Sequence, residues 1–423
     1  MFINYALYRA RDIQYHALKR ETRMPRASFL SQNVPSVSFS SERFSSAFEN
    51  VRHKRRERFV RPMMMSSSSI RDAKTSRSAT STNENKKNKR VVVITGGNTG
   101  LGCISAREIA RLSTMNADDE NGGKEKEFMY SVVIACRSLE RGRKAMREVG
   151  LFLDDEEGKE GETNPSVDVM ECDLSSFKST RAFAEKFKSK YDRLDVLMNN
   201  AGVMALPEKT LTEDANELQM QTNHLSHFAL TRELLPLMLE TEKRYPERKP
   251  RVVNVASIAH EWGFVDFFNL NSEGVFGYPG WGWITYGRTK MANVLFTYEL
   301  QRKLRKIGSK IQAYCVHPGV VDTELQRNLP IDWYVNLREA GRLINPPEGA
   351  RGQIFVATSE ALENDEGGKY SSELSNEGKP GEHAFRSSNA FSLDQENWAK
   401  LWKESERITG AKYDDVFHPS DSV

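Results

Sequence analysis

Three residues in the second half of the chain have the types and spacing needed to move a proton to or from an oxygen atom. Tyr286 and Lys290 are four positions apart, so on a helix both project from the same face. A tyrosine phenol has a pKa of about 10, and a close ammonium group favours its ionised form. We therefore expect Lys290 to lower the pKa of Tyr286. Ser257, which follows the apolar run 251–256, is placed to stabilise a developing oxyanion by donating a hydrogen bond.

The segment 91–102 (VVVITGGNTGLG) predicts the first element that must position these residues. The β-branched run 91–94 is too short for a helix and predicts a strand buried on both faces. Gly96 allows a tight turn, Gly100 lets the backbone approach phosphates, and Gly102 lets the next helix pack closely. The positive end of that helix then faces an anion, so the segment predicts a pyrophosphate-binding site.

Apolar runs predict six further strands, which alternate with helical patterns. They lie at 130–135, 167–172, 194–198, 251–256, 311–316 and just after Tyr370. This alternation predicts a single α/β domain, a doubly wound Rossmann fold over residues 89–415. We expect a seven-stranded parallel sheet in the order 3-2-1-4-5-6-7, helices on both faces, and the site at the carboxyl ends of the strands.

Several motifs occur in the order expected of one enzyme family. The spacing T-G-x-x-x-G-x-G at 95–102, N-N-A-G at 199–202 and Y-G-R-T-K at 286–290 resemble the short-chain dehydrogenases/reductases. N-H-L-x-H-F at 223–228 and W-A-K-L-W-K-E-S at 398–405 are similar to the retinol dehydrogenase-like branch of that family. The resemblance covers about residues 90–410.

The resemblance implies four catalytic residues. Tyr286 exchanges a proton with the substrate oxygen, and Ser257 donates a hydrogen bond to it. Lys290 acts on Tyr286 and holds the nicotinamide ribose. Asn223 distorts its helix and holds a water that relays protons to Lys290.

The resemblance also implies a cofactor site and favours NADP. In dinucleotide folds an acid after the second strand grips the ribose of NAD, whereas here Arg137 stands there, and a guanidinium suits a 2′-phosphate. Asp173 is expected either to bind the adenine or to cap the helix that begins near Ser175. The expected cofactor-binding residues are Gly96, Asn98, Thr99, Gly100, Leu101, Gly102, Arg137, Asp173, Leu174, Asn200, Ala201, Gly202, Tyr286, Lys290, Pro318, Gly319, Val321 and Thr323.

Two segments are expected to contact the substrate. Residues 261–285 separate Ser257 from Tyr286 and are rich in aromatic residues, which suggests a wall for a bulky apolar substrate. Simple packing of the loop would explain the same aromatics. Residues 324–345 would form a variable lid over the site.

Charge divides the chain into a basic leader and an acidic remainder. Residues 1–90 hold 20 Lys and Arg against 7 Asp and Glu, and the remainder holds 41 against 51. The basic balance therefore gives no reason to expect nucleic acid as a partner. The leader, residues 1–88, is rich in Ser and Arg and predicts a disordered transit peptide. Its serine content favours the chloroplast over the mitochondrion.

The remaining composition limits other classes of protein. The four cysteines have no metal-ligand spacing, so we expect buried thiols in a reducing compartment and no metal site. No apolar run approaches the length of a membrane span.

Three functions stay open. The first is an NADP-dependent oxidoreductase interconverting an alcohol and a carbonyl on a retinoid or lipid-aldehyde substrate. The second is a pigment-biosynthesis reductase of protochlorophyllide reductase type. The third is an NADP-binding redox sensor of a plastid import complex. Family members often pair through the two helices that hold Asn223 and Tyr286, so a homodimer is also expected.

Overall fold

A computed structural model describes residues 89–115, 130–151, 167–273, 278, 282–372 and 384–417. The leader, residues 1–88, lies outside the described residues. The transit peptide, the chloroplast location and the domain limits at 89 and 415 therefore stay predictions.

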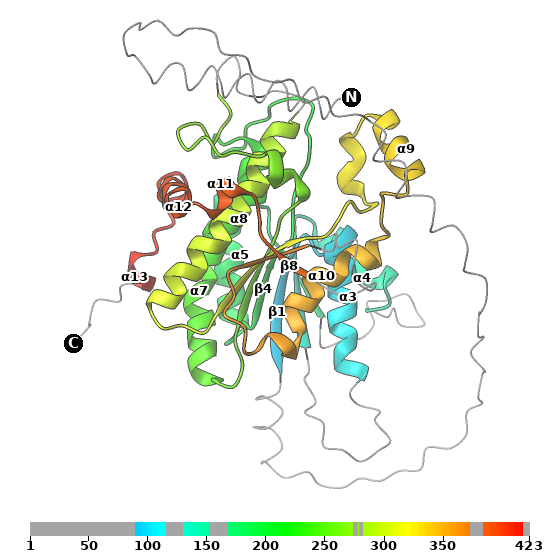
Figure 1. The fold of residues 1–423 in the computed structure, drawn as a ribbon. Coiled ribbons are helices and arrows are strands. Elements are labelled where there is room, and N and C mark those ends of the chain that lie inside the picture. The colour runs from blue at the N-terminus through cyan, green and yellow to red at the C-terminus, as the bar shows by residue number, and fades with distance from the viewer. Residues whose placement is uncertain are drawn as a thin grey trace, which may run out of the picture. The chain divides into compact units, whose positions relative to one another are not determined.

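One sheet runs through the described part of the chain, in the strand order β3-β2-β1-β4-β5-β6-β7-β8 (Figure 1). The first seven strands are parallel and follow the order predicted from the sequence. The eighth, β8, pairs antiparallel with β7 at the sheet edge and was not predicted. The strands are β1 Arg90–Thr95, β2 Tyr130–Cys136, β3 Val167–Glu171, β4 Val196–Asn199, β5 Arg251–Val255, β6 Gln312–His317, β7 Lys369–Ser372 and β8 Ala384–Arg386.

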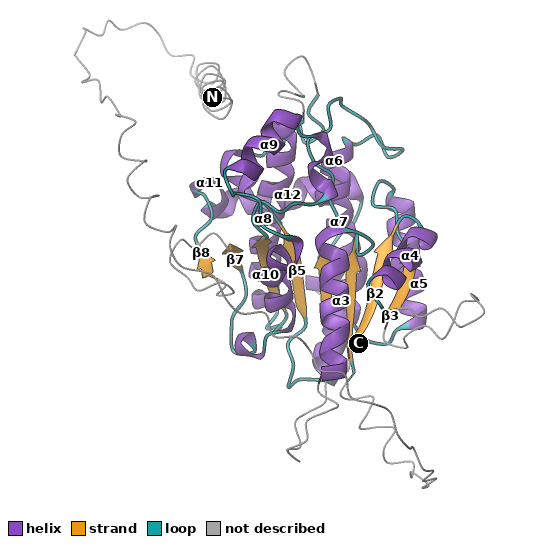
Figure 2. Ribbon diagram, turned by 90° about the vertical axis from the view of Figure 1, so that its right-hand side faces the viewer, coloured by secondary structure: helices purple, strands orange, loops and turns teal. Residues whose placement is uncertain are grey.

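Helices cover both faces of this sheet (Figures 1 and 2). One face carries α3 Gly100–Met115, α4 Leu139–Glu148 and α10 Pro346–Thr358. The other carries α5 Phe177–Lys190, α7 Ser226–Arg244 and α8 Trp283–Lys306. The remaining helical elements are short or peripheral: α6 Leu218–Met220, the π-helix η3 Gln221–Leu225, the 3₁₀ helices η4 Ile258–Trp262, η5 Glu324–Asn328 and η6 Glu360–Leu362, and α9 Ile331–Glu339, α11 Ala390–Leu393, α12 Gln395–Thr409 and α13 Asp414–Phe417.

The strand β1 shows why a short β-branched run specifies this fold. All six of its residues are buried. Val91 and Val93 pack in the cluster with α5, α7 and α8, while Val92 and Ile94 pack in the cluster with α3, α4 and α10. Because successive side chains alternate between faces, a strand covered by helices on both sides must be apolar throughout. The predicted α/β Rossmann fold is confirmed.

The helix α12 lies against the outer side of α7 and α8. Its Trp402 ring is 5.0 Å from the ring of Phe228 in α7 and 5.9 Å from that of Phe296 in α8. Leu401 and Trp402 of this helix are buried. The homodimer stays a prediction, and the chain's own α12 covers part of the face through which family members often pair.

Within the described residues, no helix is both long and apolar enough to cross a bilayer. The same residues hold no group of three or more His, Cys, Asp or Glu side chains able to bind a metal ion. All four cysteines are buried and carry free thiols.

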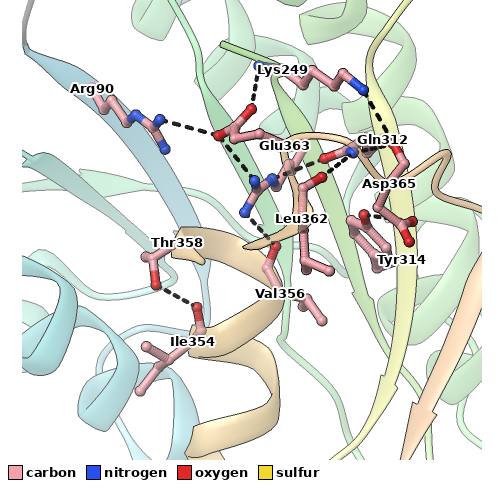
Figure 3. Close-up of polar contacts among 11 residues, drawn as sticks. Arg90, Lys249, Gln312, Tyr314, Ile354, Val356, Thr358, Leu362, Glu363 and Asp365 are labelled. Carbon is pink, nitrogen blue, oxygen red and sulfur yellow. Dashed lines mark hydrogen bonds and ion pairs between the residues drawn. The ribbon is translucent and has the colours of Figure 1, made fainter. Parts of the chain in front are cut away.

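A buried ionic cluster closes the opposite end of the sheet from the predicted site (Figure 3). Arg251 is 1% exposed and bonds to Gln312 Oε1 at 3.0 Å, Val356 O at 3.2 Å and Glu363 Oε1 at 3.0 Å. Glu363 also accepts from Arg90 Nη2 at 3.3 Å and from the backbone amide of Lys249 at 3.2 Å. One carboxylate therefore joins β1, β5 and the segment after α10.

We expect Glu363→Gln to lower the free energy of unfolding by about 2 kcal/mol, because the amide leaves the Arg251 guanidinium buried without its counter-charge. The measurement is urea unfolding followed by circular dichroism. Glu366→Gln is the matched control, since that side chain is 85% exposed and 3.8 Å from Arg305. It should change stability by less than about 0.5 kcal/mol. An equal decrease in the free energy of unfolding of Glu363→Gln and Glu366→Gln would contradict a structural role for the ionic cluster.

Candidate active site

The glycine-rich turn joins β1 to α3 as the sequence predicts. Gly96 and Gly100 have φ of +65° and +52°, a left-handed conformation that glycine adopts without strain. A Cβ built on Gly102 would lie 2.5 Å from Gly96 O and 2.5 Å from Asn200 Nδ2, so only glycine fits there. Asn98, Thr99 and Leu101, also expected to hold the cofactor, lie on the same turn and are half-buried or exposed.

The N-N-A-G turn after β4 lies directly beside the end of β1. The backbone amides of Asn200 and Ala201 both donate to Thr95 Oγ1 at 3.0 Å. The side-chain amide of Asn200 donates to Thr95 O at 2.8 Å. The two turns that were predicted to hold the cofactor are therefore fixed to one another by a single threonine.

Gln353 of α10 supports these turns and was not identified from the sequence. It is fully buried, and its Nε2 lies 2.7 Å from Ser105 Oγ and 3.2 Å from Asn200 Oδ1. A glutamine in a helix about 150 positions downstream carries no sequence signal for such a contact. Its position follows only from the packing of α10 against α3.

On the adenosine side, Arg137 and Asp173 follow β2 and β3. Arg137 is exposed and immediately precedes Ser138, whose side chain caps α4. Asp173 Oδ1 accepts from the amide of Ser175 at 2.9 Å and from its hydroxyl at 2.7 Å. The cap of α5 is Ser176, not Asp173. The carboxylate of Asp173 thus shapes the turn before the helix.

Leu174, the other residue expected on this side, is buried. Its carbonyl accepts a hydrogen bond from Ser226 Oγ at 2.7 Å. This contact attaches the turn after β3 to the first residue of α7.

The segment after β6 returns to the glycine turn. Pro318 is buried, and Gly319 has φ +87°, which again favours glycine. Val321 is buried and forms a parallel bridge with Ile344. A Cβ built on Gly100 would lie 3.6 Å from the Thr323 methyl group, so Thr323 faces the turn across a gap of about one atom.

Asn223 lies in a distorted helix, as expected. Residues Gln221–Leu225 form a π-helix between α6 and α7. Its side chain is fully buried: Oδ1 accepts from the amide of Val203 at 2.8 Å, and Nδ2 donates to Val203 O at 2.9 Å and Thr289 Oγ1 at 3.0 Å. Asn223 thus joins the segment after the N-N-A-G turn to the helix that carries Tyr286 and Lys290.

Tyr286, Lys290 and Ser257 meet above the ends of β4 and β5. Tyr286 is buried, and Ser257 is the neighbouring side chain that acts on the pKa of its phenol. Lys290 Nζ lies 5.7 Å from the centre of the Tyr286 ring and donates to Val255 O at 2.8 Å. Ser257 also caps η4, accepting from the amide of Ala259 at 3.2 Å.

The expected lowering of the Tyr286 pKa by Lys290 is wrong for the protein without its cofactor. Burial raises the pKa of Tyr286 to about 12, and only the hydrogen bond from Ser257 opposes this. Burial also lowers the pKa of Lys290 to about 8. Both effects have one cause, since each charged form loses contact with water, and the ammonium is directed at a backbone carbonyl instead of the phenol.

Apolar side chains surround the phenol. Tyr286 packs with Met204, Ala205 and Ala259, and Leu325 and Leu329 of the predicted lid join this cluster. The aromatic wall is only partly as expected. In the described part of 261–285, Trp283 packs edge-to-face against Tyr286, with the ring centres 6.2 Å apart. Trp333 of α9 extends it, 5.2 Å from Trp283.

Most other described aromatics of this segment point elsewhere. Trp262, Phe264 and Phe268 are 36%, 43% and 101% exposed. Phe267 stacks on Phe391 of α11 at 6.2 Å. Loop packing and exposure therefore account for these rings, while Phe276 and Trp281 lie outside the described residues.

Known proteins share this architecture and these motifs. A family model described as short chain dehydrogenase matches residues 132–332. Human retinol dehydrogenase 11 is 36% identical over 274 residues, which are 65% of this chain and 74% of that protein. Human retinol dehydrogenase 12 is 38% identical over 279 residues, with 65% and 75% covered.

The chain belongs to the short-chain dehydrogenase family. It is thus an oxidoreductase of a family that uses NAD or NADP. A solved structure of an uncharacterised protein from Mycobacterium paratuberculosis is also similar, with a TM-score of 0.54 and 32% identity over 76% of this chain and 93% of that one.

The residues present fit the dinucleotide that short-chain dehydrogenases bind. The turn around Gly96 and Gly100 lies at the amino end of α3, where backbone amides and the helix dipole favour phosphate. A Cβ built on Gly202 would lie 3.2 Å from Asn223 Oδ1 and 3.6 Å from Lys290 Nζ. A glycine is therefore what leaves room for a ligand group beside the Lys290 ammonium.

The Lys290 environment predicts a pH dependence of this short-chain dehydrogenase. Because its pKa is lowered to about 8, the ammonium is present below that pH and is lost above it. The kcat/KM for NADPH reports groups of the free enzyme, so it should fall as the pH rises through about 8. A kcat/KM that stays constant up to the ordinary lysine pKa of about 10 would contradict the lowered pKa of Lys290. Circular dichroism at each pH is the control for unfolding.

Proposed function

We propose that this chain is an NADP-dependent oxidoreductase that interconverts an alcohol and a carbonyl on a bulky apolar substrate of retinoid or lipid-aldehyde type. One observation carries the proposal. The buried phenol of Tyr286 adjoins Ser257 and Lys290, and the same phenol belongs to an apolar cluster with Met204 and Ala259. Proton-transfer groups and an apolar surface thus meet at one atom.

In the direction of reduction, the bound cofactor would supply a hydride to the carbonyl carbon. The carbonyl oxygen would then carry the negative charge of an alkoxide. Ser257 donates a hydrogen bond to the carbonyl oxygen and stabilises the negative charge that develops there. Tyr286 then gives its phenolic proton to that oxygen, so the phenol O–H bond breaks and the alcohol O–H bond forms. With a pKa of about 12, Tyr286 holds this proton at neutral pH.

Lys290 and Asn223 have supporting roles in this proposal. The Lys290 ammonium would bind the ribose hydroxyls of the cofactor and stabilise the tyrosinate left after proton transfer. The buried side chain of Asn223 fixes the loop at Val203 and the helix at Thr289, so it holds both sides of the site together. The relay water that the family resemblance implies would return the proton through this region.

Two features support the choice of cofactor and substrate. Arg137 is exposed at the end of β2, where a guanidinium can meet a 2′-phosphate bidentately. The substrate side is supported by the edge-to-face contacts of Trp333 with Trp283 and of Trp283 with Tyr286, which give an aromatic path from α9 to the phenol. The similar human proteins are named retinol dehydrogenases, which agrees with an apolar aldehyde or alcohol.

The test is a steady-state screen of protein lacking residues 1–88 against retinal, long-chain alkanals and a tetrapyrrole, with NADPH or NADH. We expect reduction of retinal or an alkanal, with NADPH preferred. Tyr286→Phe should lower kcat by at least about 10²-fold, the lower range for a positioned acid–base group, with a much smaller effect on NADPH affinity.

Tyr298→Phe is the matched control, because Tyr298 is a buried tyrosine of the same helix whose hydroxyl bonds Ser388 at 2.7 Å, outside the site. It should keep wild-type kcat. Light-dependent reduction of the tetrapyrrole alone would favour the pigment-biosynthesis reductase. NADPH binding with no turnover of any carbonyl would favour the redox sensor.

A further inference from the structure

A chain of hydrogen bonds connects the N-N-A-G turn after β4 to the π-helix that contains Asn223. The backbone amides of Asn200 and Ala201 donate to Thr95 Oγ1. Thr95 Oγ1 lies 2.9 Å from His227 Nε2, and His227 Nδ1 lies 3.1 Å from Asn223 O. The imidazole of His227 therefore stands between the end of β1 and the backbone carbonyl of Asn223.

The donors and acceptors in this chain can be assigned from the partners. A hydroxyl has two acceptor lone pairs and one proton, and two amides already occupy the lone pairs of Thr95 Oγ1. Its proton therefore goes to His227 Nε2 at 2.9 Å, since the alternative acceptor, Met198 O, is 3.4 Å away. With Nε2 as acceptor, the imidazole proton is on Nδ1 and is donated to Asn223 O.

Burial keeps this imidazole neutral. His227 is 1% exposed, and desolvation lowers its pKa to about 4. The charged group that bears on it is Lys290, which disfavours a second proton. One tautomer is thus fixed over the whole neutral range, and each ring nitrogen has one defined partner.

From this geometry we propose that His227 is a positioning residue. It holds the Asn223 carbonyl, and with it the π-helix, at a fixed distance from Thr95 and the N-N-A-G turn. The inference rests on the proposed function, in which Asn223 and Lys290 act together. Asn223 is then held from two sides. Its side chain is bound by Val203 and Thr289, and its carbonyl by His227.

The neighbouring His224 shows that burial alone does not give this arrangement. His224 is also fully buried, and burial lowers its pKa to about 3. It lies in the π-helix next to Asn223. Its Nε2, however, bonds Ser405 Oγ of α12 at 2.9 Å, on the side away from β1. His224 is therefore a matched control for any substitution of His227.

The test compares His227→Asn, His227→Gln and His224→Asn. An asparagine amide takes roughly the place of Nδ1, and a glutamine amide reaches roughly the place of Nε2. His227→Asn should keep kcat but weaken NADPH binding about two- to tenfold, because the bond to Thr95 is lost. His227→Gln should keep NADPH affinity but lower kcat about two- to tenfold, because the bond to Asn223 O is lost. His224→Asn should change neither value.

NADPH affinity is measured by fluorescence titration without substrate, and thermal unfolding is recorded for each variant. The proposal is supported if His227→Asn changes mainly NADPH affinity and His227→Gln changes mainly kcat. It is overturned if the two variants change both values equally, or if His224→Asn changes them as much. If the wild type reduces no carbonyl, the proposed function fails, and the NADPH affinities alone still decide the role of His227.

A second measurement reads the protonation of His227 in the wild-type protein directly. Nitrogen-15 spectra of histidine-labelled wild-type protein at neutral pH should show that the imidazole of His227 is neutral and protonated on Nδ1. Its signal is identified by its absence from the His227 variants, or by elimination with His224→Asn. A proton on Nε2 of His227 would overturn the proposal.

Discussion

The hydroxyl of Thr95 is the contact on which the rest of the site depends. It lies at the carboxyl end of β1, where it accepts the amides of Asn200 and Ala201 and bonds the imidazole of His227. The parallel register of β1 and β4, with Ile94 opposite Met198, brings these groups together. Because Thr95 is fully buried, loss of its hydroxyl would remove a shared partner of these groups at a position away from water.

Burial also decides the protonation states of Tyr286 and Lys290. Tyr286 and Lys290 are both removed from water, so the pKa of the phenol rises and that of the ammonium falls. Both shifts favour neutral groups in the free protein. A ligand that adds hydroxyl groups beside Lys290, in the space left by Gly202, would offset part of this desolvation. The site is thus arranged as a proton donor.

The sequence was sufficient for the order of the strands and for the glycine turns, because these depend on local patterns. A β-branched run such as 91–94 specifies a strand buried on both faces, and the positive φ of Gly96 and Gly100 follows from the turn. The gathering of Asn223, Ser257, Tyr286 and Lys290 follows from the meeting of parallel strands at one edge. Their catalytic roles stay proposals.

Features that depend on distant packing could not be predicted. Gln353, the antiparallel β8 and the edge-to-face contact of Trp333 with Trp283 each join segments whose local patterns carry no sign of the partner. The pKa of Tyr286 was misjudged for a related reason. The spacing of Tyr286 and Lys290 gives their common face, but the depth of burial and the direction of the ammonium are set by the surrounding fold.

The most direct measurement compares NADPH affinity in Thr95→Val and Thr95→Ser. Valine keeps the branched shape but removes the acceptor that the amides of Asn200 and Ala201 share, whereas serine keeps the hydroxyl. The Asn200 amide retains its bond to Met198 O, so the main loss is the pairing of the Ala201 amide, worth about 1–3 kcal/mol. The account predicts NADPH binding at least about tenfold weaker in Thr95→Val and within about threefold of wild type in Thr95→Ser. Wild-type affinity in a folded Thr95→Val protein would contradict the claim that this hydroxyl organises the site.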